Sequence, residues 1–351
     1  MNGFDPDAAA VAGGLFGLPH PPEEARVVIV PVPWEATTSY GGGTSDGPAA
    51  ILAASAQVDL FDVDTGRPWE GGIAMLPMPS DVRSWSEEAR ILADPVIAAG
   101  GPIRPELALA IERIDALGEQ LNGWVERQVE HWIAEGKLVG VVGGDHSVSF
   151  GSIAAHARRW PGLGVLHIDA HADLRVAYEG FEWSHASIMF NVISKLPDVA
   201  RLVQVGIRDV GEREAALIES DPRRIFTAFD ADLRDAAHAG VPFARVADRI
   251  AEALPPAVYV SFDIDGLDPS LCPSTGTPVP GGLAFGDAVG LLQALVRAGR
   301  RIVGFDLTEV APGATGEWDG NVGARILYKL IGFALQSQGV VTPPGRRLFS
   351  R

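Results

Sequence analysis

The segment GVLHIDAHAD, residues 164–173, carries the clearest structural signal in the chain. Gly164–Ile168 is a mainly apolar run typical of a buried β-strand, and a polar stretch follows it at once. Seven further runs of this kind are Val27–Val32, Ile73–Leu76, Leu138–Val142, Leu202–Ile207, Ile225–Phe229, Val258–Phe262 and Ile302–Leu307. Strands that alternate with longer helical patterns predict an α/β fold with a parallel sheet.

Helical patterns occupy most gaps between these strands, so we expect helices on both faces of the sheet. The expected helices are Pro48–Ala56, Arg104–Ala134, Val148–Arg158, His185–Ser194, Pro242–Leu254, Phe285–Val296 and Asn321–Ser337. No repeat or linker divides the chain. We therefore predict one domain over residues 1–351, with residues 1–22 forming an N-terminal arm that wraps over it.

Composition narrows the class of protein. The chain has 351 residues, 47% of them hydrophobic, and a net charge of −17, which argues against nucleic acid and anionic membranes as partners. It has no apolar stretch of membrane-spanning length and no signal-peptide pattern at its N-terminus. Its single cysteine, Cys272, cannot form an internal disulfide. We expect a soluble, cytoplasmic enzyme.

Three polar motifs follow predicted strands. They are GGDHS at 143–147, DAHAD at 169–173 and DIDGLDP at 263–269. Residues two apart on a strand point the same way, so Asp169, His171 and Asp173 can converge on one point, and Asp263 and Asp265 share a face. The carboxyl ends of parallel strands meet at one edge of a sheet. The three motifs are therefore expected to form a single site.

The chemistry of this expected site favours metal ions. Its candidate ligands are His146, Asp169, His171, Asp173, Asp263 and Asp265. Imidazole and carboxylate ligands without thiolate suit Mn²⁺, Fe²⁺, Co²⁺ or Ni²⁺ better than structural zinc. Six ligands are too many for one ion that keeps a water, but they suit two ions about 3.5–4 Å apart with shared carboxylates. Helix caps or ion pairs are the alternative, yet the motifs hold few cations.

The motifs GGDHS, DAHAD and SFDIDGLDP resemble the metal signatures of the ureohydrolase superfamily of arginases and agmatinases, and the similarity runs from about Val27 to Ser337. The resemblance implies a three-layer α/β/α sandwich with a mainly parallel eight-stranded sheet, two divalent metal ions, Mn²⁺ or Ni²⁺, and a homo-oligomer, trimer or hexamer. By position, one ion would be bound by His146, Asp169, Asp173 and Asp263. The other would be bound by His171, Asp169, Asp265 and Asp263, with Asp169 and Asp263 bridging.

The same resemblance implies two catalytic residues. Glu309 stands where the family places a carboxylate that grips the guanidinium, a planar cation that suits a bidentate acceptor. His185 stands where the family places a histidine that shuttles protons. The implied reaction is attack of a metal-bridged hydroxide on the guanidino carbon, which releases urea and either ammonia or an amine.

The substrate is the least determined part of this prediction. The stretch Ser184–Asn191 differs from the usual agmatinase pattern and resembles a subgroup similar to guanidine hydrolases, which favour nickel. Phe181, Trp183 and Trp318 are expected to form an apolar, cation–π wall around a small guanidinium. We therefore expect free guanidine or a small alkylguanidine as substrate. Three other substrates stay open: agmatine, a biguanide of the metformin type, and a guanidino acid whose carboxylate would bind Arg175. Arginine is disfavoured.

Two readings from other classes also stay open. A zinc deacetylase of similar fold would bind one ion, and a non-catalytic subunit of a hetero-oligomeric ureohydrolase would bind metal without turnover. The native metal, the oligomeric state and any need for a partner subunit or maturation factor are not decided by the residues.

Overall fold

Eight strands form one sheet in the order β2-β1-β3-β8-β7-β4-β5-β6, and every adjacent pair is parallel. The computed structural model describes residues 5–8, 13–314 and 316–345. The strands are β1 (Val27–Val32), β2 (Ile73–Met75), β3 (Leu138–Gly143), β4 (Leu163–Ile168), β5 (Val199–Ile207), β6 (Ile225–Phe229), β7 (Ala257–Asp263) and β8 (Arg301–Thr308). The expected eight-stranded parallel sheet is confirmed.

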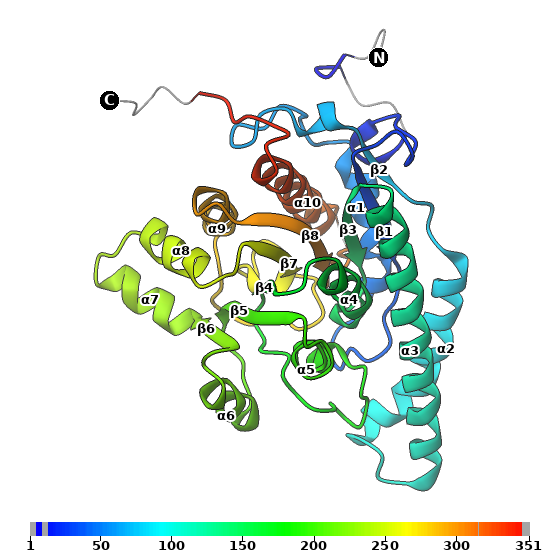
Figure 1. The fold of residues 1–351 in the computed structure, drawn as a ribbon. Helices are drawn as coiled ribbons and strands as arrows, with labels where there is room; N and C mark the ends of the chain where they lie inside the picture. The colour runs from blue at the N-terminus through cyan, green and yellow to red at the C-terminus, as the bar shows by residue number, and fades with distance from the viewer. Residues whose placement is uncertain (1–4, 9–12, 315, 346–351) are drawn as a thin grey trace.

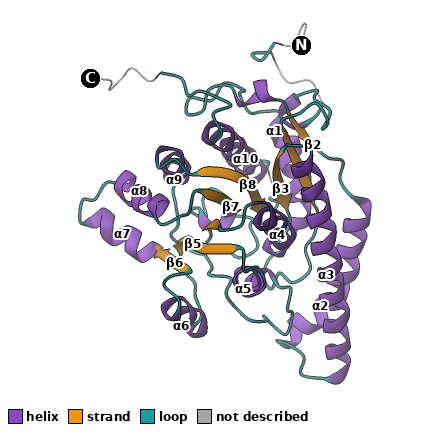
Figure 2. Ribbon diagram, viewed as in Figure 1, coloured by secondary structure: helices purple, strands orange, loops and turns teal. Residues whose placement is uncertain are grey.

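Helices cover both faces of this sheet, as Figures 1 and 2 show. One face is covered by α1 (Gly47–Ser55), α7 (Asp230–His238), α8 (Phe243–Glu252), α9 (Phe285–Arg297) and α10 (Trp318–Ser337). The other is covered by α3 (Pro105–Ala134), α4 (Ser149–Arg159), α5 (Ile188–Lys195) and α6 (Glu212–Ser220), and α2 (Ser80–Ala99) packs on α3. This is the expected three-layer α/β/α sandwich.

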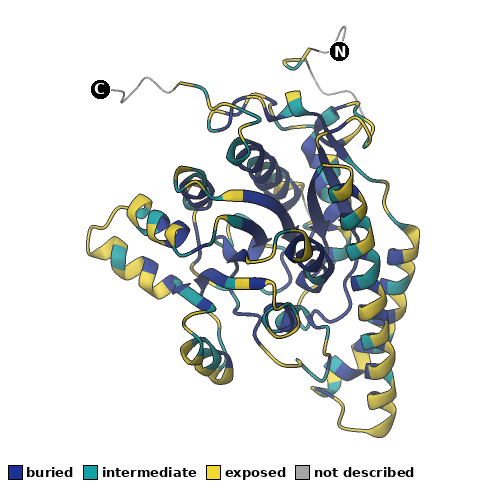
Figure 3. Ribbon diagram, viewed as in Figure 1, coloured by how far each residue is buried: buried dark blue, intermediate teal, exposed yellow. Residues whose placement is uncertain are grey.

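The core lies between the sheet and the helices, where Figure 3 shows the central strands buried over most of their length. All six residues of β1, β3 and β4 are buried, which explains why these strands read as apolar runs. The helices α2, α6 and α7 were not predicted. Helix α2 contains Pro95 in its interior, and prolines usually end helices. No helix of the described ranges combines the length and apolarity that a bilayer span requires.

The order of the strands brings the polar motifs together. GGDHS begins in the last residue of β3, DAHAD follows β4 directly, and the motif at 263–269 begins in the last residue of β7. Glu309 follows β8 directly. These strands are four consecutive members of the sheet, β3-β8-β7-β4, so their carboxyl ends open into one crevice.

The segment Leu15–Leu18 of the N-terminal arm packs onto the core. Leu15 and Phe16 are buried, and the backbone N–H of Phe16 donates to Ser55 Oγ at 2.9 Å. The ring of Phe16 lies edge-on to Tyr328 of α10, with the centroids 4.7 Å apart. Residues 1–4 and 9–12 of the expected arm fall outside the described residues.

This docking predicts that the arm contributes to stability. Phe16→Ala should lower the free energy of unfolding by about 3–5 kcal/mol, because the change removes a buried ring and leaves a cavity. The measurement is urea denaturation followed by circular dichroism. Phe61→Ala is the matched control, since Phe61 is 52% exposed, and it should change the free energy by less than about 1 kcal/mol. Equal effects in the two variants would contradict a docked arm.

Candidate metal centre

The first group of metal-binding atoms gathers around His146, in the short 3-10 helix His146–Val148 that follows β3. Its Nδ1 lies 3.1 Å from Asp169 Oδ2, 3.0 Å from Asp173 Oδ2 and 3.4 Å from Asp263 Oδ2. One imidazole nitrogen thus faces three carboxylate oxygens that come from two other strand ends. This is the ligand set expected for one ion.

The second group gathers around His171. Its Nδ1 lies 3.1 Å from Asp265 Oδ2 and 3.5 Å from Asp169 Oδ1. Asp169 therefore presents Oδ2 to the first group and Oδ1 to the second, which suits a bridging ligand. Asp263, the other expected bridge, accepts the backbone N–H of Asp265 on Oδ1 at 2.9 Å and turns Oδ2 toward His146.

The charge balance of the two groups favours cations. Four aspartates at most 5% exposed share this volume, and in the described part of the chain only histidines form ion pairs with them. Burial, followed by the charges of Asp265 and Asp169, raises the pKa of Asp263 well above its usual range. Burial and Asp169 likewise raise the pKa of Asp173 to about 6. Divalent ions would relieve this repulsion, so the donor set fits a binuclear centre.

Two acidic residues of the site have an unusual backbone conformation. Asp173 has φ 54° and Glu309 has φ 62°, both in the left-handed region that residues other than glycine rarely adopt. The carbonyl of Asp173 accepts the N–H groups of Met189 and Phe190, and the N–H of Glu309 donates to the carbonyl of Gly144 at 2.7 Å. Strain of this kind is typical of functional sites, where surrounding contacts hold it in place.

Glu309 is buried beside the first group and has one uncommitted oxygen. Its Oε1 accepts the backbone N–H of His146 at 2.9 Å, whereas Oε2 has no hydrogen-bond partner among the described residues. Burial, together with Asp145, raises the pKa of Glu309 well above its usual range. A Cβ atom at Gly276 would lie 3.2 Å from Oε2, so glycine at this position avoids crowding the buried oxygen. The arrangement suits a cation with several N–H donors.

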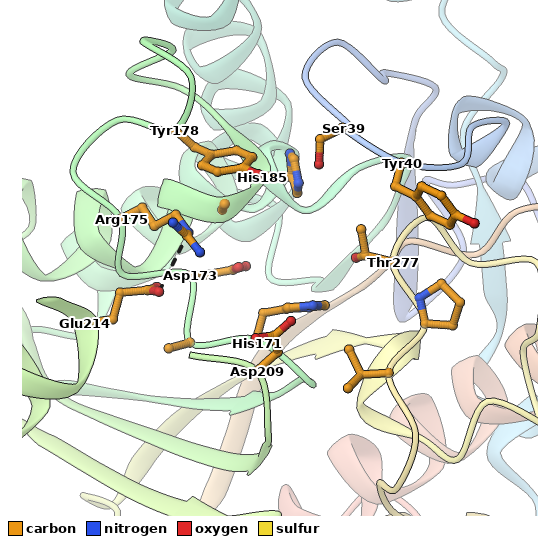
Figure 4. Close-up of a pocket in the computed structure, with 14 residues that line it drawn as sticks. Ser39, Tyr40, His171, Asp173, Arg175, Tyr178, His185, Asp209, Glu214 and Thr277 are labelled. Atoms are coloured by element: carbon orange, nitrogen blue, oxygen red, sulfur yellow. Dashed lines mark ion pairs between the residues drawn. The ribbon is translucent and has the colours of Figure 1, made fainter. Parts of the chain in front are cut away.

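A cavity of about 250 Å³ opens over the second group (Figure 4). His171 and Asp173 reach it from the metal centre, and His185 lies across from them. Its remaining walls are formed by Ser39, Tyr40, Ala172, Arg175, Tyr178, Ala186, Asp209, Glu214, Thr277, Pro278 and Val279. Glu309 is not among the lining residues.

His185 begins a 3-10 turn, and its Nδ1 lies 3.1 Å from Thr37 Oγ1. Burial, followed by the charges of His171 and His146, lowers the pKa of His185 to about 3. The imidazole is therefore neutral near pH 7, and it must accept a proton before it can donate one. The role of His185 as a proton shuttle stays a prediction.

The three aromatic residues expected around the substrate do not line the cavity. Phe181 is fully buried in a separate apolar cluster between α2 and α3. Trp183 packs edge-on against Phe150 with centroids 4.8 Å apart, and Trp318 is 53% exposed, with its Nε1 donating to the carbonyl of Ser270. The aromatic residues of the cavity are instead Tyr40 and Tyr178, which stand on opposite sides of it (Figure 4).

Sequence reasoning also missed residues that support the ligands. His146 Nε2 lies 2.9 Å from Ser261 Oγ, and that hydroxyl donates to Asp306 Oδ1 at 2.9 Å. His167 lies on β4 with Nε2 2.7 Å from Asp169 Oδ2, so its ring is close to the atoms of the first group. The spacing of two that links Asp169 to His171 also links it to His167, so the signal was present in the sequence.

Comparison with known proteins agrees with this geometry. A model of the arginase family matches residues 25–332. The chain belongs to the arginase family. It is therefore a ureohydrolase, a hydrolase of C–N bonds in guanidino compounds, in a family that depends on a binuclear metal centre.

Among its relatives is the N(1)-aminopropylagmatine ureohydrolase of Thermus thermophilus, 33% identical over 323 residues that cover 91% of this chain and 94% of the relative. An agmatinase of Cronobacter sakazakii is 32% identical and covers 82% of this chain and 80% of its own. The agmatine ureohydrolase structure of Thermoplasma volcanium shares the fold, with a TM-score of 0.71 at 22% identity over 93% of this chain and 95% of that one.

The number of metal ions bound per chain should distinguish Asp169, which faces both groups, from Asp173, which faces one. Wild-type protein equilibrated with Mn²⁺ should hold about two ions per chain. Asp173→Asn should keep about one, because Asp173 faces only the first group, whereas Asp169→Asn should keep less than one, because both groups lose a ligand. Plasma mass spectrometry measures these ratios. Asp268→Asn is the control from the same motif as Asp263, and loss of metal in this variant, or full occupancy in Asp169→Asn, would contradict the assignment.

Proposed function

We propose that this protein uses two divalent metal ions, Mn²⁺ or Ni²⁺, to hydrolyse a guanidino compound to urea and an amine or ammonia. One observation carries the proposal. Two His/Asp groups share the carboxylate of Asp169, and the first of them adjoins a buried glutamate, Glu309, with a free oxygen. The ions would be bound by the six residues His146, Asp169, Asp173, Asp263, His171 and Asp265.

The residues of the site have separate roles in the proposed reaction. When bound, the ions lower the pKa of a coordinated water and so make hydroxide available near neutral pH. Glu309 holds the guanidinium by a charge-assisted hydrogen bond to Oε2 and thereby orients its central carbon. His185, neutral and fixed by Thr37, accepts a proton and returns it to the departing nitrogen.

The lining of the cavity favours a substrate with a second cation. The charge of Arg175 is offset by Glu214, whose Oε2 lies 3.7 Å from Arg175 Nε. The side chain of Asp209 forms no hydrogen bond or ion pair with any described residue, and it lies beside His171 (Figure 4). An uncompensated carboxylate in a cavity of about 250 Å³ leaves room for an alkyl tail that ends in an amine. An agmatine-like substrate thus fits this cavity better than free guanidine, because Phe181, Trp183 and Trp318 do not line it.

A panel of substrates tests this proposal. Urea release should be measured with Mn²⁺-loaded and Ni²⁺-loaded protein on free guanidine, methylguanidine, agmatine and 4-guanidinobutyrate. We expect the highest kcat/KM for agmatine. Asp209→Asn should lower this value about tenfold, as removal of a charged hydrogen-bond partner does, and should leave guanidine turnover unchanged. Highest activity on free guanidine would contradict the proposed agmatine-like substrate and support the substrate expected from the sequence. If no substrate yields urea, the protein is better explained as a non-catalytic subunit.

Glu309→Gln tests how the guanidinium is held. The amide keeps the size of the side chain but loses its charge, so kcat/KM should fall by about 100-fold or more, as when one partner of a buried ion pair is removed. Metal content should stay unchanged, because Glu309 belongs to neither group. The matched control is Glu317→Gln, an exposed glutamate from the following loop, which should retain wild-type kcat/KM. Wild-type kinetics in Glu309→Gln would exclude this role.

A further inference from the structure

A row of polar side chains crosses five neighbouring strands beneath the metal centre. The register pairs Asp306 of β8 with Ser261 of β7, Ser261 with His167 of β4, His167 with Gln204 of β5, and Gln204 with Thr227 of β6. All of these except the half-buried Thr227 are fully buried. Polar residues at such positions persist only if they are hydrogen-bonded, so their partners show what the row does.

The amide of Gln204 has a single orientation that satisfies its neighbours. Its nitrogen donates to the carbonyl of Ala172 at 2.7 Å, and its oxygen accepts the hydroxyl of Thr227 at 3.0 Å. The reverse orientation would set the amide oxygen against the carbonyl oxygen of Ala172. The same nitrogen lies 3.0 Å from His167 Nδ1 and therefore donates to it.

This orientation determines where His167 carries its proton. An Nδ1 atom that accepts a hydrogen bond has no hydrogen, so the hydrogen of the neutral ring is on Nε2. That atom lies 2.7 Å from Asp169 Oδ2 and donates to it. A nitrogen that carries hydrogen has no lone pair for a metal ion. His167 thus differs from His146, whose Nδ1 faces three carboxylates.

We propose that His167 is a positioning residue of the metal centre, which holds the shared carboxylate of Asp169 through a donated N–H and does not itself bind metal. The carboxylate must keep Oδ2 toward the first group and Oδ1 toward the second. A hydrogen bond from a ring fixed by the strand register stops rotation of that carboxylate. Gln204 and Thr227 act through His167, because they set its tautomer.

The inference rests on the metal centre of the proposed function, and a Co²⁺ titration of the apoprotein tests the two separately. His167→Phe removes the donor but keeps the ring, and it should bind Co²⁺ about 10–100-fold more weakly, as is usual for loss of a partner behind a metal ligand. At saturation it should still bind two ions and show the wild-type d–d absorption bands, because the ligand set is intact. His167→Gln restores an N–H donor and should bind within about threefold of wild type.

Thr227→Val is a second variant at a tolerant position, on the edge strand β6. Loss of one hydrogen bond at the end of the row should weaken Co²⁺ binding about threefold. His167→Phe with wild-type affinity would overturn the inference alone. Altered d–d bands or one missing ion at saturation would also overturn it, because His167 would then be a ligand. A wild-type protein that binds no Co²⁺ would overturn the metal centre itself.

Discussion

Mutual repulsion between buried carboxylates is the constraint around which this protein is built. Asp169, Asp173, Asp263 and Asp265 lie within one crevice from which water is largely excluded, with histidines as their only ion-pair partners in the described chain. Such a set is stable in two ways. Burial and mutual repulsion raise the pKa of some members, so that these can be neutralised by protonation, whereas bound metal ions would neutralise the set without it. The surrounding structure serves the second way, because hydrogen bonds from backbone N–H groups and from His167 orient Asp169, Asp263 and Asp265 without filling the space between them.

The sequence allowed the strands to be predicted, and it singled out side chains that the structure brings together, because both follow simple periods. Buried parallel strands are continuous apolar runs, and a spacing of two after β4 pointed to Asp169, His171 and Asp173, although the structure divides His171 and Asp173 between the two groups. No comparable sequence pattern predicts which residues line the cavity. Phe181 lies in the sequence near His185, yet it packs between α2 and α3, because burial in an apolar cluster decides the place of a ring and proximity in sequence does not. The role of His167 depends on the orientation of Gln204, which only the register of three strands reveals.

Glu309 and the aspartates have different relations to their surroundings. The aspartates face one another across strand ends, and several residues together hold them in place. Glu309 depends on single features: a left-handed backbone that turns it inward, a bond from the N–H of His146, and a glycine at 276 that leaves its second oxygen free. Divergence of substrate preference in this fold can therefore proceed by change in the cavity loops, while the strand ends and Glu309 stay constant.

The strand order has a consequence for synthesis of the protein. The last two strands to leave the ribosome, β7 and β8, lie in the middle of the sheet, between β3 and β4. Until they insert, the strands already made belong to two separate half-sheets, β2-β1-β3 and β4-β5-β6, each with an unpaired inner edge. A nascent chain that ends before β7 holds His146 and Asp169 on different half-sheets and lacks Asp263 altogether. Complete metal capture must then follow insertion of β7 and β8, and the open edges before that moment are where chaperones would be needed.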